Sequence, residues 1–472
     1  MSDIVIYGSG YKAEIVYGLL NEMKKAPILC IDSNKDKQGR EWHGMRIEAP
    51  DKLTDCKNSF IFISATDINN EIYNLLLLYG IKPQKIKKFY EVILWIIKKD
   101  NGRVVQKSIN KWETIIFDTI NGYNAGGVEE WSKSLLKEFQ KKYPEMKMYL
   151  VGPAGEVIDD SQLLSNQMDV DINVEKKWSI KNLKLLISEL IRKMPFIVVT
   201  GSQNITFFAA LYLKIQYPDY VHIISVVHQG TDIAYKEYAD TEKYLKNIVA
   251  VSKDIVQGLK EQGICYNKIQ YMTCPVSIPK TFDREYSNGN LPIKIGYAGR
   301  IVIGQKRLDY LPYLLKQLSL RNINYYMELA GDGNYLESIE KLLIQEHLEN
   351  KVKLLGKIKR DDIPQFWGRQ DICINLSDHE GRSISIMEAM VNGAVPIVTA
   401  TSGVRDDIID AESGYIVELG DYVSMAERIE TLYQDRSHLR VMGYNAHRIM
   451  VKKCSMKRHI KLWEELLLAD KG

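Results

Sequence analysis

The sequence predicts an α/β protein of three domains, in which short buried strands alternate with helices. At 472 residues the chain is longer than a single hydrophobic core usually serves, and it suggests about three domains. Apolar residues make up 45% of the chain and charged residues 26%, which is typical of a globular protein. Glycine-containing loops join an apolar, β-prone run to a helical pattern after residues 7, 118 and 298. This strand, loop and helix order favours parallel sheets covered by helices.

The totals also exclude several function classes. The net charge of +3 is too small to indicate nucleic-acid binding by itself. The six cysteines are scattered without a Cys-x-x-Cys pair, which predicts reduced thiols and no zinc site. The N-terminus runs straight into a strand and so shows no secretory signal, and no apolar run approaches the ~20 residues of a membrane span. We therefore expect a cytoplasmic protein with no nucleic-acid partner.

The sequence of residues 1–100 predicts a small domain that resembles nucleotide-binding domains. A strand at residues 4–7 leads into Gly8-Ser-Gly10, then a helix, then a second strand that ends at Asp32. Glycines for a tight turn, a helix start for phosphate and an acid for ribose make a Rossmann-type opening, here with Ala13 as the third small residue. With Gly44, the run at residues 32–39 resembles the N-terminal domain of sugar acyltransferases that bind nucleotide-sugars. Two alternatives stay open: the domain binds a nucleotide, or it keeps the turn and binds nothing.

Residues 85–99 interleave lysines with bulky apolar side chains. Such a segment can lie at a membrane surface, with lysines toward anionic headgroups. It can also be a helix or strand that closes the domain, with the lysine stems lying along apolar surface. The pattern favours the domain-closing helix or strand. The membrane alternative stays open, and it predicts peripheral contact with the inner face of a membrane.

The second and third domains are predicted at residues 111–280 and 292–472. In the second, a strand at 113–118 precedes Gly126 and Gly127 and a helix, and a later strand ends in His228. A histidine at the carboxyl edge of a parallel strand faces the crevice where ligands of α/β proteins bind. A polar, turn-rich linker at 279–291 separates the domains, and the third opens with a strand followed by Gly299-Arg300 and Lys306.

Two glutamates in the third domain define the candidate site. A strand at residues 371–376 is followed by a polar loop with Glu380, and then by a helical pattern that contains Glu388. At roughly 1.5 Å per helical residue the two acids lie about 12 Å apart. That separation is too large for one shared proton or metal ion, but it suits two parts of one elongated ligand. The helix start offers unpaired amides and a positive dipole end, which suit phosphate.

These motifs resemble the donor-site signature of family 4 retaining glycosyltransferases, which have the GT-B fold of two facing Rossmann-like domains. The match is Glu380, seven residues, then Glu388-Ala-Met, with a glycine and a proline following. The spacing Gly393-Ala-Val-Pro396 is one residue longer than the usual Gly-x-Pro. Gly299-Arg300, Lys306 and the turn at 331–333 match in the same order, and the resemblance covers about residues 111–472.

The resemblance implies a role for each candidate residue. Glu380 is expected to face the transferred sugar, Glu388 to bind the ribose, and His228 to lie near the sugar, although Gln229 replaces the usual Asp. Arg300 and Lys306 are expected on the diphosphate, whose charge grows as the glycosidic bond breaks. The remaining donor-binding residues that the resemblance implies are Gly126, Gly127, Gly381, Arg382, Ser383 and Ile384.

The predicted function is transfer of a sugar, expected from a UDP-sugar, to a hydroxyl with retention of anomeric configuration. The resemblance implies a glycan, lipid-linked or protein-linked acceptor in surface polysaccharide or glycoconjugate biosynthesis. No cofactor is expected, and no metal, because family members generally need none and no Asp-x-Asp motif stands in a suitable loop. Two alternatives stay open: a non-catalytic subunit that partners an active transferase, and oxidoreductase or acyl-transfer chemistry centred on Gly8 and Gly10.

Overall fold

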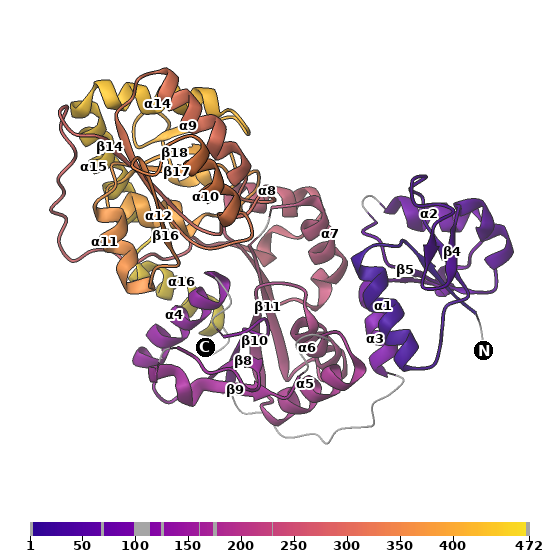
Figure 1. The fold of residues 1–472 in the computed structure, drawn as a ribbon. Helices are drawn as coiled ribbons and strands as arrows, with labels where there is room; N and C mark the ends of the chain where they lie inside the picture. Colours follow the sequence, from indigo (N-terminus) through magenta and orange to yellow (C-terminus); the bar gives the residue numbers. More distant parts are fainter. Residues whose placement is uncertain are drawn as a thin grey trace.

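The computed structural model describes residues 3–67, 70–98, 114–123, 127–159, 161–172, 177–228 and 230–468. It contains three sheets, of six, seven and six strands, and each is built almost entirely from parallel pairs and flanked by helices (Figure 1). The α/β class with parallel sheets is therefore confirmed. None of the helices in the described residues combines the length and apolar character that a membrane span needs.

The first sheet has the order β3-β4-β2-β1-β5-β6, and only the β3–β4 pair is antiparallel. Strand β1 lies between β2 and β5, so the Gly8 turn that follows it stands at the centre of the sheet's carboxyl edge. The elements are β1 Ile4–Tyr7, α1 Tyr11–Glu22, β2 Leu29–Ile31, β3 Glu41–Trp42, β4 Met45–Glu48, β5 Phe60–Ile63, α2 Glu71–Leu78, β6 Ile86–Lys88 and α3 Phe89–Lys98.

Helix α3 joins this first domain to the second one. Its residues Val92, Ile93, Ile96 and Ile97 are buried in a core that continues into the second domain. Figure 1 shows α3 beside helices α5 and α6 of that domain, and the Phe89 ring packs edge-on against Phe208 with centroids 5.6 Å apart. The apolar face of the segment is thus covered by protein. This packing agrees with the favoured interpretation of residues 85–99 as a segment that closes the domain, because these apolar side chains lie between two domains.

The second sheet is all parallel, with the order β13-β12-β11-β10-β7-β8-β9. Strands β7, β10 and β11 are neighbours, so their carboxyl ends share the edge that faces the third domain. The elements are β7 Thr114–Asp118, α4 Gly127–Lys142, β8 Lys147–Pro153, β9 Gln167–Val170, α5 Ile180–Arg192, β10 Phe196–Thr200, α6 Ile205–Gln216, β11 Val221–Val227, α7 Asp232–Thr241, β12 Asn247–Ala250, α8 Lys253–Glu261 and β13 Ile269–Tyr271.

The third sheet has the order β16-β15-β14-β17-β18-β19. The chain builds outward from β14 in one direction, returns, and builds outward from β17 in the other, so β14 and β17 flank the topological switch point where α/β folds bind ligands. The elements are β14 Ile293–Ala298, α9 Leu311–Leu320, β15 Tyr325–Ala330, α10 Leu336–Gln345, β16 Val352–Gly356, α11 Ile363–Gly368, β17 Ile372–Asn375, α12 Ile384–Val391, β18 Val395–Thr399, α13 Val404–Asp407, β19 Tyr415–Val417, α14 Tyr422–Gln434, α15 Arg436–Lys453 and α16 Met456–Leu468.

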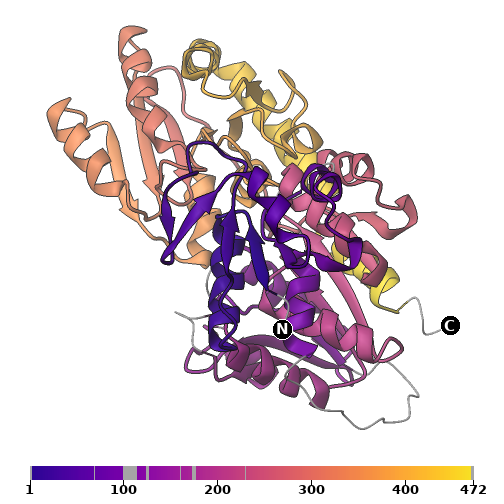
Figure 2. The same ribbon diagram turned by 90° about the vertical axis from the view of Figure 1, so that its right-hand side faces the viewer.

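The last helix, α16, returns to the second domain and lies against α4 (Figure 1). Figure 2 shows this yellow segment running away from the rest of the third domain toward the C-terminus. The indole nitrogens of Trp131 and Trp463 both donate to Nε2 of His459, at 3.0 and 3.1 Å. His459 Nδ1 lies 2.9 Å from the Thr273 carbonyl oxygen, to which it donates. Burial lowers the His459 pKa to about 4 although the Thr273 contact opposes this, so the ring is neutral and accepts at Nε2.

Candidate active site

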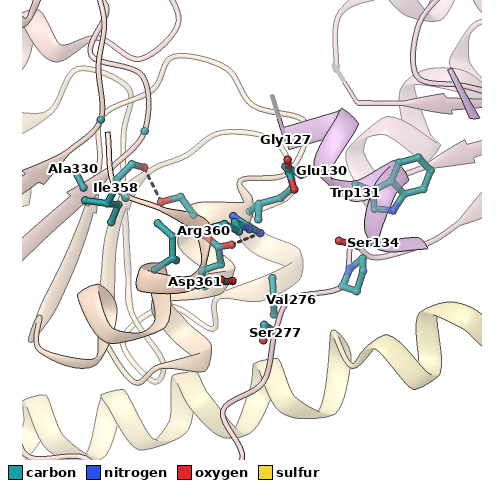
Figure 3. Close-up of a pocket in the computed structure, with 18 of the residues that line it drawn as sticks. Gly127, Glu130, Trp131, Ser134, Val276, Ser277, Ala330, Ile358, Arg360 and Asp361 are labelled. Carbon is teal, nitrogen blue, oxygen red and sulfur yellow. Dashed lines mark hydrogen bonds and ion pairs between the residues drawn. The ribbon is translucent and has the colours of Figure 1, made fainter. Parts of the chain in front are cut away.

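A cleft of about 1140 Å³ lies between the second and third domains. Its walls are one face of α4 from Gly127 to Lys141, residues 275–278 after β13, the loops at the carboxyl ends of β14, β15 and β16, and the first turns of α12 (Figure 3). The cleft therefore occupies the switch point of the third sheet. Its volume is large enough for a ligand longer than a single sugar.

Two helix starts meet at this cleft. A Cβ atom on Gly127, the first residue of α4, would lie 3.6 Å from Cδ1 of Ile384, the first residue of α12. The Ser385 hydroxyl donates to the Ala298 carbonyl at 2.7 Å, which holds the first turn of α12 against the end of β14. A helix start offers backbone amides without partners inside the helix and the positive end of the helix dipole. Together they form a region of the cleft that suits an anion.

The two predicted cations occupy different positions. Arg300 follows β14, lines the cleft and is exposed, and its Nη2 donates to Gln305 Oε1 at 2.6 Å. Lys306 instead forms an ion pair with Glu380, with 2.5 Å between Nζ and Oε1. Lys306 and Glu380 are not among the cleft-lining residues, whereas Arg300 is.

Glu380 is held on two sides in the loop after β17. Its side chain is 9% exposed, and besides Lys306 it receives a hydrogen bond of 2.8 Å from the Ser377 hydroxyl. The loop also receives a bond from the Gln305 side chain to the His379 carbonyl, at 3.0 Å. Because Gln305 also contacts Arg300, the loop after β14 and the loop after β17 form one hydrogen-bonded unit.

Glu388 lines the cleft from the second turn of α12 and pairs with Arg360, with 2.6 Å between Nη2 and Oε1 (Figure 3). Burial raises the pKa of Glu388 and the Arg360 guanidinium opposes the rise, with a net upward shift. Arg360 was not predicted as a site residue. The available signal was the basic run Lys357-Ile-Lys-Arg360, which follows β16 at the same carboxyl edge as the other candidates.

Arg382 departs from its predicted role in binding a donor. Its side chain is buried between the domains, where Nε donates to Asp407 at 3.1 Å and Nη1 donates to the Val251 carbonyl at 3.0 Å and to the Tyr271 hydroxyl at 3.2 Å. These contacts occupy the guanidinium away from the cleft, which leaves only its backbone for a ligand. The physical reason is that Asp407, 25 positions further along the chain, offers the buried partner that a guanidinium needs.

The neighbours of Arg382 form the approach to α12. Ser383 precedes α12 in extended geometry, and its side chain makes no capping bond, so the first amides of the helix stay unpaired by that route. The Gly381 carbonyl lies against Gly403, where an added Cβ would come within 2.7 Å of the oxygen. Gly403 has φ of +81°, so both its conformation and its close contact favour glycine.

His228 lies directly after β11 and packs its ring against Trp131, with centroids 5.7 Å apart. Trp131 lines the cleft, and His228 itself does not. Burial lowers the His228 pKa to about 4, and its Nε2 has no hydrogen-bond partner among the described residues. The ring is therefore neutral near pH 7. Gly126 and Gln229 lie outside the described residues.

In the first domain, the Gly8 turn forms as the sequence predicts, but the Asp32 carboxylate accepts hydrogen bonds from nearby loop residues. Gly8 has φ of +99°, and an added Cβ would lie 2.9 Å from Cβ of Ala65. The Asp32 carboxylate receives hydrogen bonds from the Ser9 amide at 3.0 Å, the Ser9 hydroxyl at 2.6 Å and the Asn34 amide at 2.9 Å. Burial works to raise the Asp32 pKa, and these bonds outweigh it and lower the pKa.

Two facing parallel-sheet domains with a cleft at their carboxyl edges define the GT-B class. Residues 280–449 match the family model "Glycosyl transferases group 1". Residues 1–87 match a second model, "C2185-like, N-terminal". Within the described residues, no group of three or more His, Cys, Asp or Glu side chains is placed to hold a metal ion.

Curated proteins and solved structures agree with this class. A capsular polysaccharide biosynthesis glycosyltransferase, CapM of Staphylococcus aureus, is 27% identical over 239 residues, or 50% of this chain and 60% of CapM. Anabaena HepE, solved with UDP and glucose, has a TM-score of 0.61 at 15% identity and covers 76% of this chain and 100% of its own. A variant of S. aureus TarM, solved with UDP, has a TM-score of 0.52 at 13% identity and covers 99% of both chains.

These comparisons confirm the GT-B prediction, with an extra N-terminal domain that has its own sheet. At these identities the solved structures show the fold alone. Among the first curated relatives, the matched stretch spans between 36% and 60% of the relative's own length.

Proposed function

We propose that the protein is a family 4 retaining glycosyltransferase that moves a sugar from a UDP-sugar to a hydroxyl. The proposed acceptor is a glycan or a lipid-linked or protein-linked sugar in surface polysaccharide or glycoconjugate biosynthesis. The observation that carries the proposal is the convergence of Arg300, Glu388 and the start of α12 on one interdomain cleft. The capsular relative and the UDP-bound neighbour of the same fold support it.

In this proposal the diphosphate lies between the starts of α12 and α4. The unpaired amides and the Arg300 guanidinium stabilise the negative charge that grows on the leaving phosphate. A fixed guanidinium offers two donors in one plane, which suits phosphate oxygens. Lys306 fixes Glu380 through their ion pair, and it reaches the diphosphate only after a movement of its side chain. The chain's own cations and amides do this work, and the proposal requires no metal or cofactor.

The two glutamates would hold opposite ends of the donor. Glu388, on the cleft wall, accepts hydrogen bonds from the ribose hydroxyls, and Arg360 favours its ionised form. Glu380, fixed by Lys306 and Ser377, orients the transferred sugar. His228 is neutral, so its unpartnered Nε2 can exchange a hydrogen bond with a sugar hydroxyl after a small movement.

The proposed chemistry keeps the configuration of the anomeric carbon. The bond from this carbon to the diphosphate oxygen breaks, and the acceptor oxygen forms its new bond from the same face. The acceptor proton passes to the departing phosphate oxygen, so the charge and atoms balance without a protein nucleophile. The protein's contribution is positioning and charge stabilisation.

The test is a screen of nucleotide-sugars for donor hydrolysis, which needs no acceptor. We expect the wild type to hydrolyse a UDP-sugar and to release the sugar first as the anomer present in the donor, detected by NMR. We expect Arg300→Ala to lower the hydrolysis rate by about 10²-fold, as removal of a transition-state charge contact does. The same screen with a chelator present tests the metal-free proposal.

A wild type that binds none of the nucleotide-sugars contradicts the proposal. UDP binding without turnover, with or without added glycans, instead supports a non-catalytic subunit. Inversion of the anomer overturns the retaining mechanism alone.

A further inference from the structure

Arg382 belongs to the third domain, but its side chain ends in the second. It stands two residues after Glu380 in the loop that leads into α12. Its side chain is 1% exposed. Nη1 donates to the Val251 carbonyl, directly after β12, at 3.0 Å, and to the Tyr271 hydroxyl, at the end of β13, at 3.2 Å.

Within its own domain, Arg382 is fixed by Asp407 at the end of α13. Nε and Nη2 each contact one oxygen of that carboxylate, so the pair is bidentate, and the Asp407 side chain is 4% exposed. A bidentate pair sets the plane of the guanidinium as well as its position. The remaining nitrogen, Nη1, is thereby aimed at the second domain.

Other contacts join the same two surfaces around Arg382. Asp406 accepts from the Lys253 amide, in the first turn of α8, at 2.8 Å and from the Tyr271 hydroxyl at 3.2 Å. The hydroxyls of Ser252 and Ser402 are 2.9 Å apart. Residues 402–407 of the third domain therefore pack on the start of α8, and Arg382 connects the Glu380 loop to this contact.

The loop has little freedom to move independently of these contacts. The Gly381 carbonyl lies against Gly403, and Glu380 is bonded to Lys306 and Ser377. A shift of the second domain at Val251 and Tyr271 would displace Arg382. Because only one residue separates them, Glu380 would move as well.

We propose that Arg382 is a positioning residue that couples the arrangement of the two domains to the loop carrying Glu380 and to the start of α12. It acts through the carbonyl of Val251 and the hydroxyl of Tyr271 and does not touch the donor with its side chain. This inference rests on the proposed function for its effect on rate, and its structural part stands independently.

The experiment compares Arg382→Lys and Tyr271→Phe with the wild type in the full chain. Lysine keeps the charge but loses the fork, and phenylalanine removes the two interdomain bonds of the Tyr271 hydroxyl, to Arg382 and Asp406, without burying a charge. The matched control is Arg321→Lys, because Arg321 also pairs with carboxylates, those of Glu427 and Glu430, but both lie on helix α14 within the third domain. The readouts are UDP affinity by calorimetry, the hydrolysis rate of the wild type's best UDP-sugar at saturation, and hydrogen–deuterium exchange.

We expect Arg382→Lys to lower the saturated hydrolysis rate by about 10- to 100-fold, because displacement by about 1 Å costs rates of this size. UDP affinity should stay within about threefold of the wild type. In binding free energy this is less than the ~1.4 kcal/mol that a tenfold change represents. Tyr271→Phe should show a smaller loss of the same kind, and Arg321→Lys none. Exchange should rise together in residues 377–388 and 250–256 of the Arg382 and Tyr271 variants.

An unchanged hydrolysis rate in folded Arg382→Lys overturns the inference. A loss of UDP affinity as large as the loss of rate also overturns it, since Arg382 would then bind the donor. If hydrogen–deuterium exchange rises in only one of the segments 377–388 and 250–256, the two segments are not coupled through Arg382. If the wild type hydrolyses no nucleotide-sugar, the proposed function fails, and the exchange comparison still decides whether Arg382 couples the domains.

Discussion

At the ribose end of the proposed site, Arg360 opposes the rise that burial causes in the Glu388 pKa. Arg360→Met removes the opposing charge, so burial raises the Glu388 pKa further. A carboxylate with a raised pKa is ionised at high pH and becomes protonated as pH falls through that value. We therefore expect UDP affinity of the variant to be lost at a higher pH than in the wild type, measured by calorimetry between pH 5 and 8. Lys359→Met removes a neighbouring exposed cation and serves as the control.

The opposite result for Arg360→Met is informative too. Arg360 also lies across the carboxylate that the ribose hydroxyls would approach. If the variant binds UDP more tightly at every pH, Arg360 competes with the ribose, and its effect on ionisation is secondary.

Glu380 offers a second test at the level of one residue. Glu380→Gln keeps the shape of the side chain but removes the charge that orients Lys306. We expect the donor hydrolysis rate to fall by about 10²- to 10³-fold with little change in UDP affinity, because the contact acts on the reacting sugar. The control is Glu337→Gln, which neutralises an exposed partner of Lys341 on helix α10 of the third domain. A fall in UDP affinity that accounts for the whole loss would place Glu380 on the nucleotide instead.

At the scale of one element, α16 joins the third domain to the second through a buried histidine. His459→Leu removes the acceptor of two indole N–H groups, which are then buried without partners. Each such group costs about 1–3 kcal/mol, so we expect the variant to be destabilised by about 2–6 kcal/mol in urea unfolding. A His459→Leu variant as stable as the wild type would show that the indoles find other partners.

The elements themselves were largely predictable from local sequence. The strand expected at 371–376 is observed as β17 Ile372–Asn375, and the helix around Ile384 to Met390 is α12 Ile384–Val391. Such elements follow from short-range apolar periodicity, which any window of the chain displays. The partners of their side chains do not. Arg382 meets Val251 across 131 positions, and no local pattern encodes which of its neighbours in space it will reach.

The same limit applies to the extra lysine-rich segment. Its amphipathic pattern was visible, but the surface that covers its apolar face is formed by helices α5 and α6, which start more than 80 residues later. A sequence pattern shows that an apolar face needs a cover, whereas the fold decides whether the cover is protein or lipid.

At the scale of the whole molecule, the first domain is docked on the second through α7 as well as through α3. Lys12 pairs with Glu237 at 2.5 Å, and Lys88 pairs with Asp240 at 2.7 Å. Both acids lie on α7, the helix that follows the His228 loop. The first domain therefore contacts the helix that follows His228, while its own Asp32 carboxylate is occupied within its loop. This arrangement favours a supporting role for the first domain over separate chemistry at Gly8 and Gly10.

Charge reversal tests this docking. Lys88→Glu brings a carboxylate against Asp240, and we expect it to destabilise the chain by about 1 kcal/mol, because both side chains are partly exposed and solvent screens the pair. Asp240→Lys alone should lower the free energy of unfolding by a similar amount, since the new lysine would face Lys88 and lie near Lys236. The double variant restores opposite charges, so its urea midpoint should return toward that of the wild type. If the two effects simply add, the pair does not hold the domains together, and the docking rests on the apolar contacts of α3 alone.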